Sequence, residues 1–312
     1  MIPNFYVNQK FYDFDDFAAT LQSWDIKINQ LKPGTRVNIL KQLHTKKMTI
    51  SSGFINGHTQ QMGDPPPFGC TISLLADTES NIIWRNKKVP ADGIMLIPAN
   101  SELDITTKFK AGIHTISPSK EILDSIVKRT GVQKLFQKNG LISIPMARAN
   151  ELRSLVCKYF FFLDQYPELA SNLAFTNGFI TDLSKKLATS LEKIENPAET
   201  RQSVNKALAW KRIENFFERN IGSPVTIGDL SETAGVSERT LQRLFHERFD
   251  VSPKTYVNIT RLNGVHRALK QAPTPKSKIS DIANHWGFWH MGQLAADYKN
   301  LFGELPSATL KK

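Results

Sequence analysis

The feature that most constrains the fold is an internal repeat in the last third of the 312-residue chain. The second copy follows the first at an offset of 52 residues up to a shared glycine and 53 residues beyond it. The first copy consists of Ile227, Asp229, Leu230, Gly235, Leu241, Phe245, Phe249 and Pro253, and the second of Ile279, Asp281, Ile282, Gly287, Leu294, Tyr298, Phe302 and Pro306. Such self-similarity indicates one supersecondary unit that occurs twice.

Each copy predicts two helices joined by a tight turn, at about residues 226–250 and 278–303. In the first copy, Thr226 and Asp229 have the spacing of a capping box, which satisfies free N–H groups at a helix start. Gly235 supplies the positive φ that ends this helix, and Ser237 can cap the next one. The apolar face of the second helix then consists of Leu241, Leu244 and Phe245.

The opposite face of that second helix carries polar and cationic side chains that suit a DNA major groove. An arginine can bind guanine O6 and N7 with two hydrogen bonds, and a glutamine can pair with adenine N6 and N7. We therefore predict DNA contacts by Arg239, Thr240, Gln242, Arg243 and His246.

A single long helix is expected between the two copies, from Pro253 to about Lys270. Its apolar residues, which we expect to pack against both units, are Tyr256, Ile259, Leu262 and Leu269. A rigid spacer of this kind can hold two DNA-reading helices about 34 Å apart, one turn of the double helix.

The charge balance supports a polyanionic partner for this part of the chain. The protein has 40 basic and 29 acidic residues, a net charge of +11. Residues from 201 onward contain 17 basic and 10 acidic residues, so +7 of that charge lies in the last 112 positions. Charge alone is also compatible with a basic enzyme, whereas charge on a repeated helix pair favours nucleic acid.

The motifs of this region resemble the C-terminal domain of the AraC/XylS family of transcriptional regulators, over about residues 205–310. They are GVSERTLQRLF (235–245), the RL of the linking helix (261–262), ISDIANHWGF (279–288) and FGELPS (302–307). Within the family, GFWHMGQLAADYKNLFGELPSATL (287–310) is most similar to the branch that includes regulators of ethanolamine utilisation. The resemblance implies a DNA-binding regulator, and an activator in particular.

The resemblance also implies base-facing positions in the second unit, at Trp289, His290, Met291, Gly292, Gln293 and Ala296. Many relatives have arginine where this chain has Ala296, so apolar or phosphate contacts are expected here in place of guanine reading. For Trp289, packing at the turn is the alternative to a DNA contact, and for His290 it is a polar surface position. Lys299 is either a phosphate contact or a solvated charge.

The N-terminal sequence predicts a β-rich part at residues 26–117, followed by helices near 119–129, 146–165 and 169–194. Short apolar segments such as CTISLL (70–75) and GIMLIP (93–98) favour a β-barrel-like, cupin-like domain. A polar linker is expected at 196–203. The predicted fold class is therefore α+β: a β-rich domain at 1–195 and an all-α DNA-binding domain at 204–312.

By family resemblance, the N-terminal domain binds a small-molecule effector and forms a homodimer. His44, His58 and His114 are too widely separated for a metal site, so no metal or cofactor is expected, and no catalytic residue is assigned. Cys70 and Cys157 stand alone in apolar segments, which predicts two buried, inert thiols. The apolar stripes of the helices at 146–165 and 169–194 suit either a cover for the sheet or a dimer interface.

The expected partners are double-stranded DNA, a second copy of the chain, an effector of unknown identity and, as a candidate, RNA polymerase. No segment is apolar for the roughly 20 residues that span a bilayer, and no signal peptide is evident, so we expect a cytoplasmic protein. The main alternative is a DNA-binding regulator whose N-terminal domain only dimerises or binds a protein. A cupin-type enzyme is a less favoured third hypothesis.

Overall fold

The structure of the chain is a computed structural model that describes residues 4–34, 37–192, 194, 201–220, 222–223, 225–273 and 277–311. Its backbone contacts divide the chain into two compact units, which are treated separately below. Unit 1 comprises Met1–Ile28, Arg36–Asn56 and Gln61–Ala198, and unit 2 comprises Asn29–Thr35, Gly57–Gln60 and Glu199–Lys312. Two short segments of the N-terminal sequence thus belong to unit 2.

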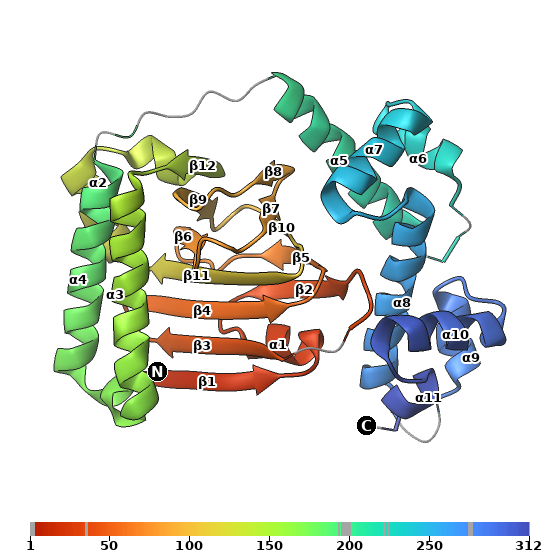
Figure 1. Ribbon diagram of the computed structural model, residues 1–312, viewed down its shortest axis with the longest axis horizontal. Coiled ribbons are helices and arrows are strands. Elements are labelled where there is room, and N and C mark those ends of the chain that lie inside the picture. Colours follow the sequence, from red (N-terminus) through yellow and green to blue (C-terminus); the bar gives the residue numbers. More distant parts are fainter. Residues whose placement is uncertain are drawn as a thin grey trace. The chain divides into compact units, whose positions relative to one another are not determined.

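Unit 1 is built on a seven-stranded sheet with the order β1-β3-β4-β11-β6-β9-β12 (Figure 1). Its strands are β1 (Phe5–Phe11), β3 (Asn38–His44), β4 (Met48–Asn56), β11 (Lys110–Pro118), β6 (Cys70–Leu75), β9 (Gly93–Pro98) and β12 (Gly140–Ser143). Each neighbouring pair is antiparallel. Strands β1 and β12 lie outside the predicted β-rich range of 26–117 and were missed.

A second sheet has five strands in the order β2-β5-β10-β7-β8. These are β2 (Asp25–Gln30), β5 (Thr59–Asp64), β10 (Leu103–Thr107), β7 (Ile82–Trp84) and β8 (Lys87–Lys88). Trp84 and Ile105 of this sheet share one apolar cluster with Met95 and Ile97 of the first sheet, so the two sheets pack face to face. The prediction of a β-rich, barrel-like domain is correct in class, but each sheet is open at both edges and does not close into a barrel.

The helices that follow β11 in the chain cover the other face of the seven-stranded sheet. Unit 1 contains α1 (Phe14–Thr20), α2 (Lys120–Thr130), the 3₁₀ helix η1 (Gln133–Gln137), α3 (Met146–Gln165), the 3₁₀ helix η2 (Pro167–Ser171) and α4 (Leu173–Leu191). Leu152 of α3 and Leu183 of α4 are fully buried in one cluster with Ile50 and Ile72 of the sheet. The apolar stripes of α3 and α4 therefore cover the sheet, while the predicted helix at 169–194 is divided into η2 and α4.

Two polar side chains of α3 attach it to the sheet. Arg153 is buried, with 7 % of the residue exposed, and its Nε donates to the Leu75 carbonyl at 2.9 Å. At the other end of the helix, Asp164 accepts hydrogen bonds from the Tyr6 hydroxyl at 2.5 Å and from Asn8 Nδ2 at 2.6 Å. Both groups fix the register of α3 across the strands, which apolar packing alone specifies less strictly.

His114 of β11 is buried between the sheet and α3, and this burial predicts a pH-dependent stability. Burial, aided by the nearby Arg153 charge and opposed by Asp77, lowers the His114 pKa from 6.5 to about 4. As pH falls below 6.5 the unfolded chain binds a proton that the folded chain does not, so unfolding becomes easier. We expect a loss of about 2 kcal/mol between pH 7 and pH 5 from this residue.

Urea unfolding of the full chain at pH 7 and at pH 5 measures this loss. The variant His114→Gln has no titrating ring at this position and should show a smaller difference between the two pH values. An equal difference for both proteins would show that other groups carry the pH dependence.

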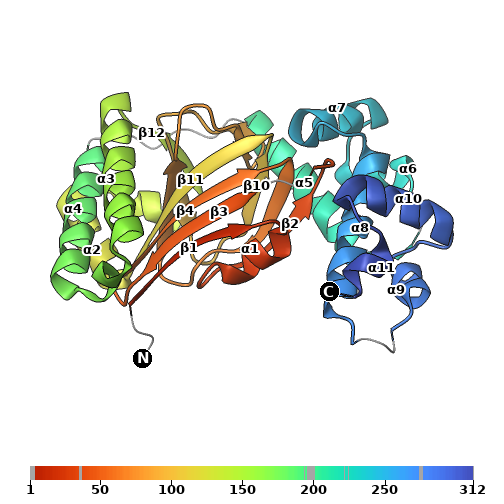
Figure 2. The same ribbon diagram turned by 60° about the horizontal axis from the view of Figure 1, so that its bottom comes forward.

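Unit 2 contains seven helices among the described residues (Figures 1 and 2). They are α5 (Arg201–Arg219), α6 (Ile227–Ala234), α7 (Glu238–Phe249), α8 (Pro253–Gln271), α9 (Ile279–His285), α10 (Met291–Phe302) and α11 (Pro306–Thr309). Helix α5 begins at Arg201, so the predicted linker ends earlier than residue 203, and residues 196–200 lie outside the described part of the chain. No helix in the described ranges is long and apolar enough to cross a membrane.

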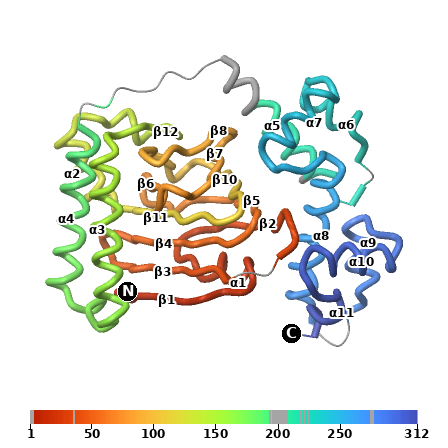
Figure 3. Tube along the Cα trace, in the orientation of Figure 1, coloured from red at the N-terminus to blue at the C-terminus, as the bar shows by residue number. Residues whose placement is uncertain are grey.

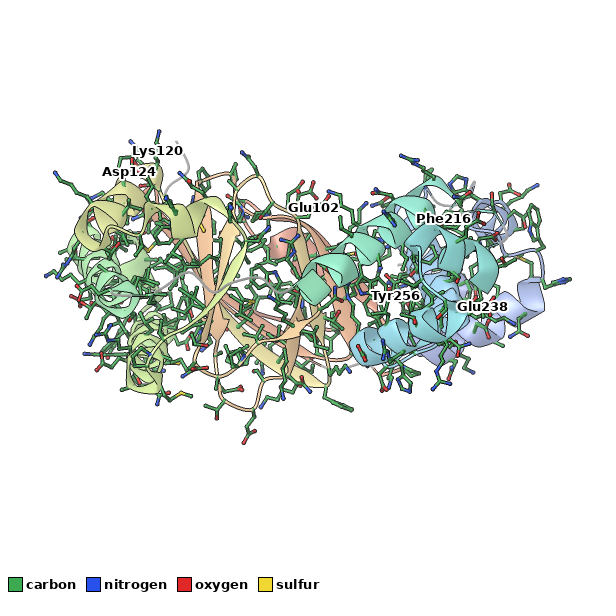
Figure 4. All side chains as sticks on the ribbon, turned by 90° about the horizontal axis from the view of Figure 1, so that it is seen from above. Glu102, Lys120, Asp124, Phe216, Glu238 and Tyr256 are labelled. Atoms are coloured by element: carbon green, nitrogen blue, oxygen red, sulfur yellow. The ribbon has the colours of Figure 1, made fainter. Side chains whose placement is uncertain are left out.

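An aromatic cluster holds α5, α7 and α8 together. The Trp210 ring lies at 4.8 Å from Phe245 and at 5.2 Å from Phe249, and Phe249 stacks on Tyr256 at 4.5 Å between ring centroids. The Arg248 guanidinium lies at 4.7 Å from the Trp210 centroid, where the ring face attracts a cation. Figure 4 shows Tyr256 among the packed helices, in agreement with its exposed fraction of 4 %.

Candidate nucleic-acid interface

Helices α6 and α7 form the first predicted helix-turn-helix unit, and its capping is as expected. Asp229 N–H donates to Thr226 Oγ1 at 3.1 Å, and Thr226 N–H donates to Asp229 Oδ2 at 2.9 Å. The Thr226 N–H bond to the carboxylate is the main cause of the lowered pKa of the Asp229 carboxyl. Gly235 has φ of 68° at the end of α6, and Ser237 caps α7. The predicted capping box and left-handed glycine are confirmed.

The outer face of α7 presents the predicted contact residues to solvent. Arg239, Gln242, Arg243 and His246 are all exposed, whereas Leu241, Leu244 and Phe245 on the other face are buried. Thr240 is half-buried at the helix start, where its hydroxyl lies 3.0 Å from Ser237 Oγ. Four of the five predicted side chains thus lie on one accessible surface.

Two side-chain pairs lie along the outer face of α7. Arg243 Nε lies 3.7 Å from Glu247 Oε1, and His246 Nδ1 lies 3.1 Å from Asp250 Oδ1. The Arg243 side chain is 63 % exposed, so the pair is solvated and weak. A guanidinium held this loosely can turn towards a base edge at small cost.

Helices α9 and α10 form the second helix-turn-helix unit, with Gly287 at φ of 81° in the turn. Trp286 lies against α8 at Gly264, where the ring comes so close that an added Cβ would be 2.2 Å from Trp Cζ3. Trp286 therefore fills the angle between the second helix-turn-helix unit and α8. Only glycine at position 264 leaves room for the ring.

The outer face of α10 is accessible but carries little positive charge. Trp289 is 68 % exposed, and His290, Gln293, Ala296 and Lys299 are exposed as well. The packing alternative for Trp289 is wrong, because Trp286 occupies that place. The DNA-contact hypotheses for Trp289, His290, Gln293 and Lys299 remain predictions about an exposed surface.

Sequence reasoning missed a hydrogen-bonded group behind this surface. Gln293 Nε2 donates to Asp297 Oδ1 at 2.7 Å, and Asn258 Nδ2 of α8 donates to Asp297 Oδ2 at 3.1 Å. The spacing of four residues between Gln293 and Asp297 is a signal that could have indicated the first bond. No signal in the sequence connects position 258 with position 297.

Helix α8 follows α7 and precedes α9, and it joins the two helix-turn-helix units (Figure 3). Its predicted apolar residues Tyr256, Ile259, Leu262 and Leu269 are all buried in the core of unit 2. The 19 residues of α8 span about 28 Å at 1.5 Å per residue. This length is of the order of one turn of the double helix.

Unit 1 offers a different kind of surface. A hollow of about 580 Å³ lies among its loops, and its lining includes the carboxylates Asp25, Asp64 and Glu102. Glu102 is labelled in Figure 4, as are the exposed residues Lys120 and Asp124 on α2. Carboxylates repel phosphate, so this hollow does not suit DNA.

The histidines and cysteines of unit 1 show one departure from expectation. Cys70 is buried, and burial raises the pKa of its thiol to about 12, as expected for an inert thiol. Cys157 is exposed, so the prediction of a buried thiol is wrong there. Its sulfur lies 3.9 Å from His114 Nε2, and desolvation nevertheless raises its pKa. His44 Nδ1 lies 2.9 Å from the Thr49 hydroxyl.

Two helix pairs, each with a left-handed glycine in its turn and an exposed outer helix, flank a shared central helix, and this arrangement defines a protein of the helix-turn-helix class. A family described as a helix-turn-helix domain matches residues 230–312. The XylDLEGF operon transcriptional activator 2 of Pseudomonas putida is 30 % identical over 128 residues, which are 41 % of this chain and 82 % of that relative. The chain belongs to the AraC/XylS family of transcriptional regulators.

Other similar proteins align with a smaller part of this chain. A second XylDLEGF operon transcriptional activator of Pseudomonas putida is 33 % identical over 104 residues, 33 % of this chain. The chain spans about a third (32 %) of the length of that relative. A solved structure of a probable AraC family transcriptional regulator from Rhodopseudomonas palustris CGA009 is 33 % identical, covers 33 % of this chain and 94 % of that chain, and has a TM-score of 0.30. None of these relatives is named for ethanolamine utilisation, so that closer resemblance stays a prediction.

Proposed function

We propose that this protein is a sequence-specific DNA-binding regulator of transcription that places α7 and α10 in the major groove. The observation that carries the proposal is the surface of α7, where Arg239, Gln242 and Arg243 are exposed side by side above a buried apolar face. These are the side-chain types that bind guanine and adenine edges in the major groove. The length of α8 and the positive charge of residues 201–312 support the proposal.

Binding of the full chain to DNA at several salt concentrations tests this function. A cognate sequence is first selected from random duplexes, and its Kd is then measured by fluorescence anisotropy. Lysine and arginine side chains that contact DNA phosphates displace the salt cations condensed on the DNA, so binding weakens as salt rises. For roughly six phosphate contacts we expect affinity to fall about 10³-fold between 50 and 200 mM salt. An affinity that does not respond to salt, or no binding to any duplex, would contradict the proposal.

We further propose that unit 1 binds a small polar effector through the face of the seven-stranded sheet that is turned away from α3. On the sheet face opposite α3, Gln42 Nε2 donates to Ser51 Oγ at 2.7 Å, and the hydroxyls of Thr71 and Ser117 lie 2.7 Å apart. Ser73 on the same face is fully buried, and its hydroxyl has no hydrogen-bond partner among the described residues. Buried polar groups of this kind suit a ligand with hydroxyl or amine groups.

A rise in melting temperature with candidate metabolites distinguishes this effector hypothesis from the alternative in which unit 1 only dimerises or binds a protein. The homodimer is also a proposal, supported by exposed apolar side chains near the turn between α3 and α4. They are Phe161, Phe162, Tyr166 and Leu173. Activation of transcription is a further proposal, supported by the activator names of the relatives. A contact with RNA polymerase and a place in the cytoplasm are proposed along with it.

A further inference from the structure

We infer that Asp297 is a positioning residue that orients Gln293, so that α10 accepts adenine and rejects guanine at one base pair. The inference rests on the proposed function and deepens it, because it assigns a base preference to the second helix-turn-helix unit.

The geometry places one carboxylate between two carboxamides. Asp297 accepts a hydrogen bond from Gln293 Nε2 at 2.7 Å, one helical turn away on α10. Its other oxygen accepts from Asn258 Nδ2 of α8 at 3.1 Å. Asp297 and Asn258 are half-buried, whereas Gln293 is exposed. The carboxylate is therefore fixed on the protein side, and Gln293 lies between it and solvent.

This arrangement determines which way the Gln293 amide faces. An ionised carboxylate can only accept hydrogen bonds, so both amide nitrogens must face Asp297. The Gln293 carbonyl oxygen Oε1 then faces away from the carboxylate. One of the two Nε2 hydrogens is used by Asp297, and the second is left to donate elsewhere.

The outward groups of Gln293, one acceptor and one donor, match adenine. Adenine N6–H₂ can donate to Oε1, and adenine N7 can accept from the second Nε2 hydrogen. Guanine presents O6 where adenine has N6, so two acceptors would face each other. Without Asp297 both Nε2 hydrogens are free, and the amide can turn about its terminal torsion so that the two hydrogens donate to guanine O6 and N7.

Small neighbours let a base edge approach Gln293. Ala296 is exposed, and a Cβ added at Gly292 would meet no atom within 4 Å. Without large side chains at these two positions, the helix can lie deep in the groove. Gln293 is then the side chain on this part of α10 that reaches a base with both a donor and an acceptor.

The test measures base preference with the full chain and a selected cognate duplex. Each base pair is changed in turn, and binding constants are measured for the unsubstituted chain, Gln293→Ala and Asp297→Ala. Gln293→Ala is expected to lower the preference for A·T over G·C about tenfold at one position. Asp297→Ala is expected to lower the same preference at the same position, through improved binding to G·C.

A double variant and a matched control complete the test. Asp297→Ala should change the preference at this position no further when Gln293 is already alanine, because the carboxylate acts through that amide. Asp124→Ala removes the same charge from an exposed site on α2 and should leave the preference unchanged. Unfolding midpoints show whether each variant is folded.

Three results would overturn the inference while leaving the proposed function intact. The first is an unchanged A·T preference at every position in Asp297→Ala or Gln293→Ala. The second is an equal loss of affinity for all duplexes, which would mean a purely structural role. The third is a loss of preference for cytosine in Asp297→Ala, at a base pair other than the one assigned to Gln293. That result would mean that Asp297 itself contacts a base. An unsubstituted chain that binds no DNA would refute the proposed function itself.

Discussion

Replacing Arg239 and Arg243 together by alanine is expected to weaken binding to a cognate site by about 2–6 kcal/mol, from two guanine contacts of about 1–3 kcal/mol each. Both side chains are exposed on the outer face of α7, so their loss should leave the helix folded. Removing Arg243 alone should cost about 1–3 kcal/mol and relax discrimination at one base pair. Titration of labelled cognate and mutated duplexes measures both effects.

The matched control removes two positive charges from unit 1 instead. Lys128 and Arg129 are exposed near the end of α2, and their replacement by alanine should change affinity little. A uniform loss on cognate and unrelated DNA in the Arg239/Arg243 variant would show that these residues contact phosphates and do not read bases. An unchanged affinity would remove α7 from the interface.

The largest expected effect on stability comes from Gly264→Ala in α8. The new Cβ would lie 2.2–2.3 Å from three carbons of the Trp286 ring. Real Cβ atoms do not approach so closely, so either the ring or the second helix-turn-helix unit must move. Overpacking of this kind costs typically 1–3 kcal/mol and occasionally more, and we expect a loss of about 3 kcal/mol. Urea unfolding followed by far-ultraviolet circular dichroism measures the change.

The same substitution at Gly292 on α10 is the control. A Cβ there meets no atom within 4 Å, so Gly292→Ala should be neutral or stabilise the helix by up to about 1 kcal/mol. In a Trp286→Ala background the clash partner is absent, and Gly264→Ala should then cost far less. An equal cost of Gly264→Ala in both backgrounds would show that the ring is not the cause.

Several elements of the fold were predictable because their signals are local. The turn residues Gly235 and Gly287 both have positive φ, and the predicted helix at 253–270 corresponds to α8 within one residue. A cap or a helical period involves residues within a few positions of one another, so physical chemistry acts directly on the printed sequence.

Other elements could not be predicted in this way. Strand β1 (FYVNQKF) carries polar residues on an edge of the sheet, and β12 is only four residues long. Neither has a period long enough to identify it. Helix α1 is seven residues long, too short for a clear hydrophobic pattern. The open sheets in place of a barrel follow from strand order, and strand order depends on pairings between distant parts of the chain.

The amino-acid sequence by itself determined the two helix-turn-helix units, their apolar and polar faces and the helix between them, because caps, glycines and helical spacing act over short distances. Only the tertiary structure decided that Trp286 packs against Gly264 while Trp289 is exposed, and that Asn258 holds Asp297 behind Gln293. These contacts join positions separated by 22 or more residues along the chain. Packing and hydrogen bonding across such separations depend on how the helices meet in space.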